Sequence, residues 1–392
     1  MQWCSALSRE TDLDAALTDI GSQISAALTL PPDVVFVFAS EHYLPHFDEL
    51  PERVRAALNA DRIVGGSASG VIAANQEIEF EPGLAILAAS LPDVDIECWH
   101  LEQHDLAPGT AHSERCAALA ARDPGQLILL ADPFSFPPEQ LLHALETAFA
   151  TSTIAGGLVS GGRSPGEMAL FVDDRCYHSG AIVLALTGNI EMLTAVAQGC
   201  RPIGEPMFAT AVDQNQLLAL DDRPPVEVLN QLYGQASDHD KQLMQHSLFV
   251  GLAMRAGEST YGQGDYLIRN VIGADQGSGS IAVAAHLHPN QVVQFHLRDA
   301  KTSADDLRQV LGRLESALGS GTPDGALLFS CTGRGRGLYG ESGHDSASFT
   351  ETIGQLPLGG FFCNGEIGPV GGTTFVHGYT SSFAVFRPIT SE

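Results

Sequence analysis

The sequence predicts an α/β protein of the mixed α+β class. Three strand–helix–Gly-rich-strand units are expected to form mixed sheets with packed helices, in two domains. The first observation is that an apolar run of strand length occurs three times, each time followed by a helix pattern and a Gly-rich apolar run. The second is the size of the chain, because 392 residues suggest two domains. The third is composition, since 44% hydrophobic and 17% charged residues provide for large cores.

The first unit follows the clearest helix signal in the chain. Apolar residues recur at steps of three and four over 13–28, which predicts an amphipathic helix that ends at Pro31-Pro32. Residues 34–39 are apolar on both faces, as in a buried strand. A helix over about 48–59 and a Gly-rich strand over 62–71 complete the pattern, and 82–88 reads as a further strand.

The same order returns twice, and the Gly-rich segments of the three units align. The apolar runs 126–131 and 325–330 predict buried strands, followed by helices after Pro137-Pro138 and over about 346–353. Glycine weakens a strand unless a bulge, or the close approach of a backbone or a ligand, requires it, so its recurrence at one place indicates a shared architecture. The aligned segments are G-G-S-A-S-G (65–70), G-G-L-V-S-G (156–161) and G-F-F-C-N-G (360–365).

Residues 187–324 lie outside the three units. Proline residues 224 and 225 open a short helix that is expected to run to about Tyr233, and apolar spacing predicts a second helix over 307–318. The segments that read as strands are 206–220, 265–272, 280–288 and 291–297.

The net charge indicates which partners are not expected, and the N-terminus and the cysteines indicate the cellular compartment. With 47 acidic against 20 basic residues, the net charge of −27 repels phosphate backbones and anionic lipid, so neither nucleic acid nor a membrane is expected as a partner. The N-terminus has no basic region and no apolar signal core, which predicts a cytoplasmic protein. Scattered cysteines, odd in number, fit reduced thiols: Cys4, Cys98, Cys116, Cys176, Cys200, Cys331 and Cys363.

Five motifs resemble those of the FIST family. They are V-V-F-V-F-A-S (34–40), V-G-G-S-A-S-G-V-I (64–72), Y-L-I-R-N (266–270), L-L-F-S-C-T-G-R-G (327–335) and G-F-F-C-N-G-E-I-G-P (360–369). The resemblance implies a FIST N-terminal region over 1–224, with two copies of the unit, and a FIST C-terminal region over 225–392, with the third copy at 325–387.

The same resemblance implies a function. FIST regions are regarded as intracellular sensory modules for small ligands, with amino acids suggested. They occur joined to signalling output domains in bacteria and to an F-box in a eukaryotic ubiquitin-ligase adaptor. Here no span is left for such a segment, so we expect the output to come from a protein partner or from self-assembly.

Polar and charged residues gather after the strands of the third unit. Arg334 lies in a Gly-rich loop directly after a buried strand, where a guanidinium and backbone amides suit an anionic ligand, although a mobile surface loop fits the same residues. Glu366 suits either a ligand amine or an ion pair with Arg269 or Arg334. The predicted ligand-binding residues are Arg269, Asn270, Ser330, Cys331, Arg334, Cys363, Asn364 and Glu366.

Two other functions stay open, and no cofactor is predicted. Cys331 next to arginines suits a nucleophile or a redox switch, with His344 as the nearest candidate base. A scaffold for protein interactions is the other alternative. No metal site is predicted, because no third ligand accompanies the histidine pairs His42/His46, His100/His104 and His286/His288. We therefore expect a small-ligand sensor without catalysis.

Overall fold

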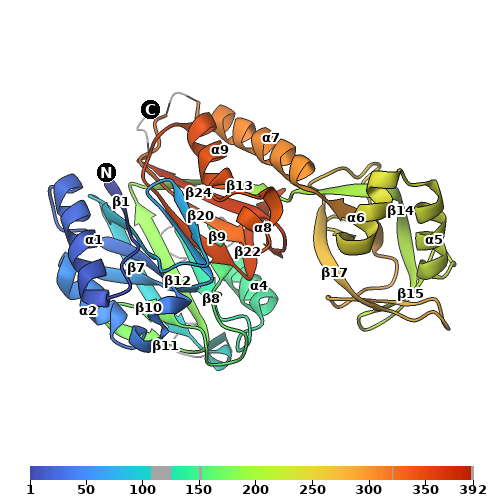
Figure 1. Cartoon of the computed structure of the whole chain (residues 1–392), viewed down its shortest axis with the longest axis horizontal. Helices are drawn as coiled ribbons and strands as arrows, with labels where there is room; N and C mark the ends of the chain where they lie inside the picture. The colour runs from blue at the N-terminus through green and yellow to red at the C-terminus, as the bar shows by residue number, and fades with distance from the viewer. Residues whose placement is uncertain (107–124, 150–151, 320, 390–392) are drawn as a thin grey trace. The chain divides into compact units, whose positions relative to one another are not determined.

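The computed structural model describes residues 1–106, 125–149, 152–319 and 321–389 (Figure 1). The predicted position Cys116 lies outside the described residues. The chain divides into two compact units, which we call the large and the small lobe. The large lobe comprises Met1–Val196, Arg308–Val376 and Thr380–Glu392, and the small lobe comprises Ala197–Leu307 and His377–Tyr379. The predicted regions 1–224 and 225–392 therefore each contribute to both lobes.

The mixed α+β class is confirmed, and the described part of the large lobe contains three six-stranded sheets. In the order of their pairing, the first consists of β1 (Gln2–Ser8), β6 (Leu84–Ser90), β2 (Val34–Ser40), β3 (Arg62–Ala68), β10 (Leu170–Val172) and β11 (Arg175–Tyr177). The second consists of β23 (Thr373–His377), β22 (Gly365–Val370), β9 (Thr153–Leu158), β8 (Gln126–Ala131), β12 (Ala181–Gly188) and β7 (Val94–Leu101). The third consists of β13 (Glu191–Ala197), β24 (Ser381–Arg387), β20 (Gly325–Cys331), β21 (Leu358–Cys363), β4 (Gly70–Ala73) and β5 (Gln76–Glu79).

The three predicted units have the same strand pairing. In each, the first strand pairs in parallel with the Gly-rich strand: β2 with β3, β8 with β9, and β20 with β21. On its other side the first strand pairs antiparallel with the last strand of the unit, which is β6, β12 or β24. A parallel pair needs a crossover connection, and a helix supplies it each time.

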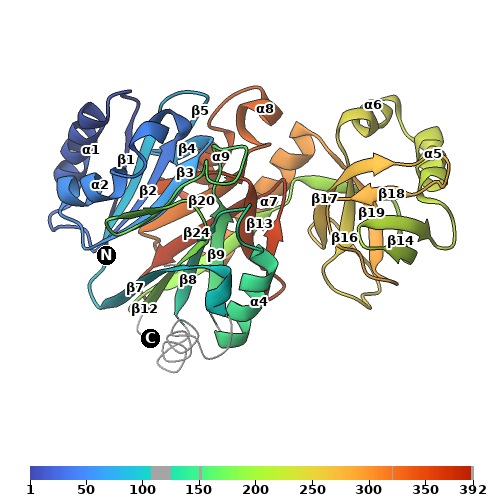
Figure 2. The ribbon, with the colours of Figure 1, turned by 90° about the horizontal axis from the view of Figure 1, so that it is seen from below.

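A feature that the sequence did not predict is the exchange of hairpins between units. Each Gly-rich strand pairs on its outer side with a hairpin from another unit: β3 with β10, β9 with β22, and β21 with β4. In Figure 2 the β4–β5 hairpin of the first unit accordingly lies beside α8 of the third. Side chains from two units therefore meet at each of these places.

The three sheets share one core, and helices cover their outer faces. Val34, Phe36 and Phe38 of β2 face this core together with Leu130 of β8 and Phe329 of β20. The alternate residues of β2 and β8 pack with helix residues, as the period of a strand requires. No helix in the described residues is long and apolar enough to cross a membrane. The helices of the large lobe are α1 (Leu13–Ala27), η1 (Glu41–His46), α2 (Leu50–Leu58), η2 (Gln103–Leu106), α4 (Pro138–Ala148), α8 (Gly335–Tyr339), α9 (His344–Ile353) and, continuing from the small lobe, α7 (Ala300–Leu318).

One glycine in each Gly-rich strand has the same structural cause. A Cβ at Gly65, Gly156 or Gly360 would come closer than 3.0 Å to a backbone carbonyl oxygen of the parallel neighbour strand, at the matching register position each time. Real Cβ atoms essentially never approach other atoms so closely. Close packing against the first strand of the unit therefore explains why this glycine occurs three times.

The small lobe is a closed barrel. Its strands are, in order of pairing, β14 (Cys200–Asp213), β15 (Gln216–Leu220), β18 (Ile281–Val283), β17 (Tyr266–Ala274), β16 (Leu248–Ala253) and β19 (Val292–Arg298). Its helices include α5 (Pro225–Gln235) and α6 (Asp238–His246). The predicted strand over 206–220 is a hairpin of β14 and β15. The sequence did not predict α6 because this helix has no buried residue and hence no apolar stripe.

Candidate functional site

The end of β20 holds a buried ion pair between Arg334 and Asp345. Arg334 lies between β20 and α8, and Asp345 is the second residue of α9. The Nε of Arg334 donates to Oδ2 of Asp345 over 2.6 Å, and its Nη2 donates to Oδ1 over 2.9 Å. Their side chains are 0% and 1% exposed. The Gly-rich loop after β20 therefore directs the side chain of Arg334 into the interior of the lobe.

Polar side chains of three further elements surround this ion pair. Asp345 accepts hydrogen bonds from Ser330 Oγ at 3.1 Å and Ser381 Oγ at 2.5 Å. Arg334 Nη2 also donates to Tyr339 Oη over 2.6 Å. Burial by itself would raise the pKa of the Asp345 carboxyl, but the charge of Arg334 and these hydrogen bonds hold that pKa well below its usual range. Asp345 is thus an anion at neutral pH, and it compensates the charge of Arg334.

A second buried carboxylate comes from the exchanged hairpin of the first unit. Glu77 of β5 lies at the start of α9, where its Oε1 accepts from the backbone N–H of Ser346 (2.8 Å) and its Oε2 from that of Gly343 (3.1 Å). Free N–H groups at a helix start favour an acidic partner. Burial and the nearby Asp345 nevertheless raise the pKa of Glu77 to about 7. The sequence analysis missed Glu77 because only the hairpin exchange shows that it lies near α9, and it missed Asp345 because a Gly-rich loop does not reveal the turn through α8.

The predicted site residues fall into two groups. Six lie in the large lobe around β20, β21 and β22: Ser330, Cys331, Arg334, Cys363, Asn364 and Glu366. Cys331 and Cys363 are register partners across the parallel pair, and Oε2 of Glu366 accepts from Thr380 Oγ1 over 2.8 Å. Arg269 and Asn270 are in β17 of the small lobe, where Asn270 Oδ1 accepts a hydrogen bond from Tyr379.

The Gly-rich strands of the three units end at a common junction. Ser69, Ser160 and Asn364 occupy equivalent positions there, one or two residues after the ends of β3, β9 and β21. The Oγ of Ser160 accepts from the backbone N–H of Ser69 over 2.9 Å and donates to the carbonyl oxygen of Phe362. Asn364 donates its backbone N–H to Leu158 over 3.0 Å, while its side chain is exposed. Ser160 is therefore buried and Ser69 half-buried, whereas Asn364 is exposed, next to the residue whose carbonyl accepts from Thr332.

Comparison with known proteins identifies the family. The model of the FIST N domain matches residues 33–223, and that of the FIST C domain matches residues 225–369. The chain belongs to the FIST family. An uncharacterized protein of Mycobacterium tuberculosis is 35% identical to this FIST protein over 355 residues, which cover 91% of each chain. An F-box/LRR-repeat protein of Arabidopsis thaliana is 26% identical over 278 residues, covering 63% of this chain and 52% of its own length.

The two matches confirm the resemblance to the FIST family that the five motifs indicated. FIST domains are associated with sensory modules in signal transduction. Among solved structures, a cyanuric acid hydrolase from A. caulinodans aligns over 99% of this chain and 100% of its own. Its TM-score is 0.33 and its sequence identity 9%, so this likeness supports no statement about function.

Both groups that the sequence suggested as activators of Cys331 contact Asp345. Arg334, the cation expected to activate Cys331, is bound to Asp345 through two nitrogen atoms. His344, the candidate base, stacks on Tyr339 with 3.6 Å between ring centroids and directs its Nδ1 to Asp345 at 3.2 Å. Burial, followed by the charges of Glu366 and Cys331, raises the pKa of the Cys363 thiol well above its ordinary value. A reactive thiolate is therefore not expected at Cys363.

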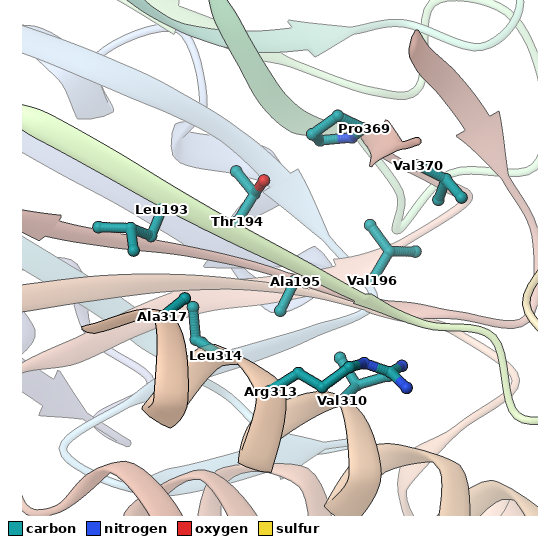
Figure 3. A pocket seen from close by; sticks show the side chains of 10 residues that line it. All are labelled: Leu193, Thr194, Ala195, Val196, Val310, Arg313, Leu314, Ala317, Pro369 and Val370. Atoms are coloured by element: carbon teal, nitrogen blue, oxygen red, sulfur yellow. The ribbon is translucent and has the colours of Figure 1, made fainter. Parts of the chain in front are cut away.

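A hollow of about 430 Å³ in the large lobe lies elsewhere (Figure 3). Its lining comes from β13, α7 and the end of β22, with aliphatic side chains and the guanidinium of Arg313 facing it. None of the eight predicted ligand residues contributes to this lining. The hollow and the Arg334 loop are therefore separate features of the large lobe.

Glu77 is expected to make the large lobe less stable as the pH rises from about 4.5 to about 7. Its folded pKa of about 7 lies above the ordinary value of 4.5, so in this window the folded state binds more protons than the unfolded state. The expected loss is at most about 3 kcal/mol. The Glu77→Gln variant should flatten this slope when unfolding by urea is measured between pH 5 and pH 8. The exposed Glu81→Gln variant is the control, and an unchanged slope in Glu77→Gln would refute the assignment.

Proposed function

We propose that this FIST protein is a sensory module that binds a small anionic ligand, such as an amino acid through its carboxylate, at Arg334. The observation that carries the proposal is that Nη1 of this fully buried guanidinium has no hydrogen-bond partner among the described residues. A buried donor without a partner costs about 1–3 kcal/mol, more if it is charged. An anionic oxygen that accepts from Nη1 would remove this cost.

The neighbouring residues provide a polar approach to this position. Thr332 and Asn364 are exposed at the ends of the paired strands β20 and β21, and the backbone N–H of Thr332 donates to the carbonyl of Cys363 over 2.9 Å. Gly333, half-buried, lies between Thr332 and Arg334 in the chain. A ligand would therefore contact the exposed polar groups first and reach Nη1 after a local movement of residues 332–335.

The output of such a sensor is proposed to pass through a partner protein. No catalytic step is proposed, because Asp345, His344 and Tyr339 already use the charges and hydrogen bonds around Arg334 to stabilise the loop. The eight residues predicted from the sequence enter this proposal as two groups. The six residues in the large lobe form the proposed site, whereas Arg269 and Asn270 belong to the small lobe.

A thermal-shift screen with free amino acids and other small carboxylates tests the proposal. A true ligand is expected to raise the melting temperature in a concentration-dependent way, with a stabilisation of about 2.7 kcal/mol at 100 times its Kd. The Asn364→Ala variant should keep the fold, because this side chain is exposed, and should require more ligand for the same shift. Asn230→Ala, at an exposed position of α5 in the small lobe, is the matched control.

Two results would contradict the proposal. If no carboxylate stabilises the protein at millimolar concentration, the sensor has another class of ligand. If a ligand stabilises the wild type and Asn364→Ala equally, with the same Kd by calorimetry, the binding site lies away from the ends of β20 and β21.

A further inference from the structure

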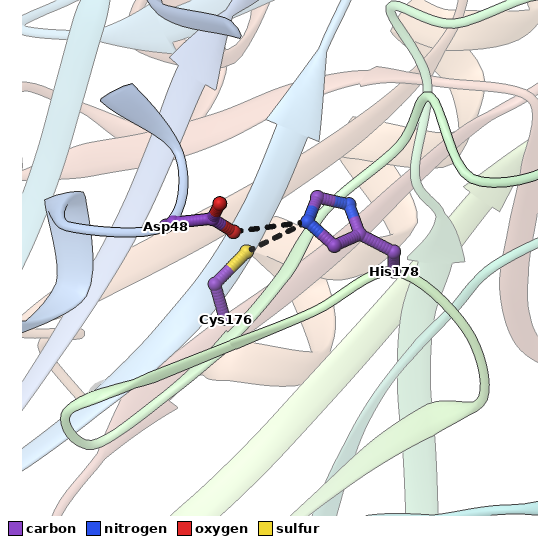
Figure 4. Close-up of side chains that lie close together, drawn as sticks. All are labelled: Asp48, Cys176 and His178. Carbon is purple, nitrogen blue, oxygen red and sulfur yellow. Dashed lines mark hydrogen bonds and ion pairs between the residues drawn. The ribbon is translucent and has the colours of Figure 1, made fainter. Parts of the chain in front are cut away.

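Three side chains with metal-binding atoms meet on the first sheet, far from Arg334. Asp48 lies in the first unit between η1 and α2, whereas Cys176 lies on β11 and His178 just after it, in the exchanged hairpin of the second unit (Figure 4). The Nε2 of His178 is 3.0 Å from Oδ1 of Asp48 and 3.8 Å from Sγ of Cys176. The three ligand atoms lie within 4.8 Å of one another. All three residues belong to the large lobe.

The other ring nitrogen of His178 determines how Nε2 can act. Its Nδ1 is 2.9 Å from the carbonyl oxygen of Met168, and a carbonyl can only accept, so Nδ1 carries a proton. In the neutral ring, Nε2 then has a lone pair directed at a carboxylate oxygen only 3.0 Å away. Two acceptors repel each other at this distance. A cation between them, either a metal ion or a second proton on the ring, resolves the conflict.

The separations fit a tetrahedral metal ion. With Zn–N and Zn–O distances of about 2.0 Å and a Zn–S distance of about 2.3 Å, nitrogen lies about 3.3 Å from oxygen and about 3.5 Å from sulfur. The observed 3.0 Å and 3.8 Å are close to these values. Metal-bound histidine usually donates its other N–H to a carbonyl or carboxylate, and Met168 provides that partner.

We propose that Asp48, Cys176 and His178 bind one divalent transition-metal ion, with zinc as the best match to sulfur, nitrogen and oxygen ligands. One thiolate and one carboxylate would balance the 2+ charge, and the net charge of −27 attracts cations to the protein. The Asp48 and His178 side chains are 87% and 41% exposed, so the ion can enter and its fourth position can hold water. Binding displaces the proton of the Cys176 thiol to solvent.

Such an ion would link the first and the second unit of the fold. It would connect the segment between η1 and α2 to the β10–β11 hairpin, which pairs with β3 along the edge of the first sheet. The sequence could not indicate it, because Asp48 and His178 are 130 residues apart and only Cys176-x-His178 is a local signal. That spacing places both side chains on one face of the hairpin strand and its extension.

Cobalt titration of the chelator-treated full chain tests this site. Co²⁺ is expected to bind at one equivalent and to give a thiolate-to-cobalt charge-transfer band, which Zn²⁺ then removes by competition. Cys176→Ser should abolish the band. Asp48→Asn and His178→Ala should each weaken binding at least about tenfold. His46→Ala is the matched control, because His46 is a similarly exposed histidine of the same unit, paired with Glu49.

Three outcomes would overturn the proposal. The first is the absence of a charge-transfer band in the wild type at micromolar Co²⁺. The second is a band that persists in Cys176→Ser, which would assign the metal to another cysteine. The third is a protonated His178 ring at pH 7.5 by NMR, unchanged by added Zn²⁺, which would make the second proton the occupant. Far-UV circular dichroism of each variant shows whether the fold is retained.

Discussion

Replacing Arg334 with alanine is expected to destabilise the large lobe by about 3–5 kcal/mol. The change removes the guanidinium that hydrogen-bonds Asp345 through two nitrogens and leaves this carboxylate 1% exposed in the interior. Ser330 and Ser381 would still donate to Asp345, but neutral hydroxyls do not replace a charge. The loss is measured as the change in the free energy of unfolding by urea at pH 7.

Arg336→Ala is the control for this experiment. Arg336 is exposed, two residues further along, and its backbone N–H, which the variant keeps, donates to Glu79 over 2.9 Å. Its loss should change stability by no more than about 0.5 kcal/mol. At pH 4 the free energy of unfolding should still be lower for Arg334→Ala than for the wild type, because Asp345 stays ionised in the folded wild type. If Arg334→Ala reduces the free energy of unfolding by less than about 1 kcal/mol, Asp345 is protonated or hydrated in this variant at pH 7.

Local patterns account for most of the elements that the sequence predicted. The runs that became β2 and β8 are apolar on both faces, because one face packs against the common core and the other against a helix. The helix over 13–28 was recognised from its single apolar stripe, which became α1. In these segments the spacing of the apolar residues determines which faces become buried. The sequence alone was therefore enough to predict these strands and this helix.

The exchange of hairpins between units could not be predicted in this way. Nothing in residues 70–79 indicates that they pair with β21, nearly three hundred positions further along the chain. Strand partners over such separations depend on which edges remain free after the local units form. For this reason the sequence analysis did not place Glu77 at the start of α9, nor Cys176 next to Asp48.

The partner of Arg334 was also not predicted from the sequence. The sequence suggested an anionic ligand for Arg334, and Glu366 was considered either as the group that binds a ligand amine or as an ion-pair partner of Arg269 or Arg334. The ion pair is instead with Asp345, 11 residues after Arg334. The turn through α8 brings the start of α9 back to the end of β20, and this local geometry cannot be read from a Gly-rich loop.

Gly156→Ala is expected to reduce the free energy of unfolding by about 3 kcal/mol. The added Cβ would overlap the carbonyl oxygen of Leu129, which is the register partner of Gly156 on β8. A backbone carbonyl cannot rotate away without breaking the parallel ladder, so relief requires separation of β8 and β9. Gly65→Ala and Gly360→Ala should have similar costs, because Val37 and Leu328 place their carbonyls in the same way.

Gly21→Ala distinguishes this explanation from a general sensitivity to glycine replacement. Gly21 is in the interior of α1, where a Cβ would meet nothing within 4 Å, and alanine favours a helix over glycine by about 0.5–1 kcal/mol. This variant should therefore be slightly more stable than the wild type. If Gly156→Ala unfolds at the same urea concentration as Gly21→Ala, the strands of the second unit are further apart than the register of β8 and β9 requires. Equal losses at Gly65, Gly156 and Gly360 would instead show that the three units depend on the same backbone contact.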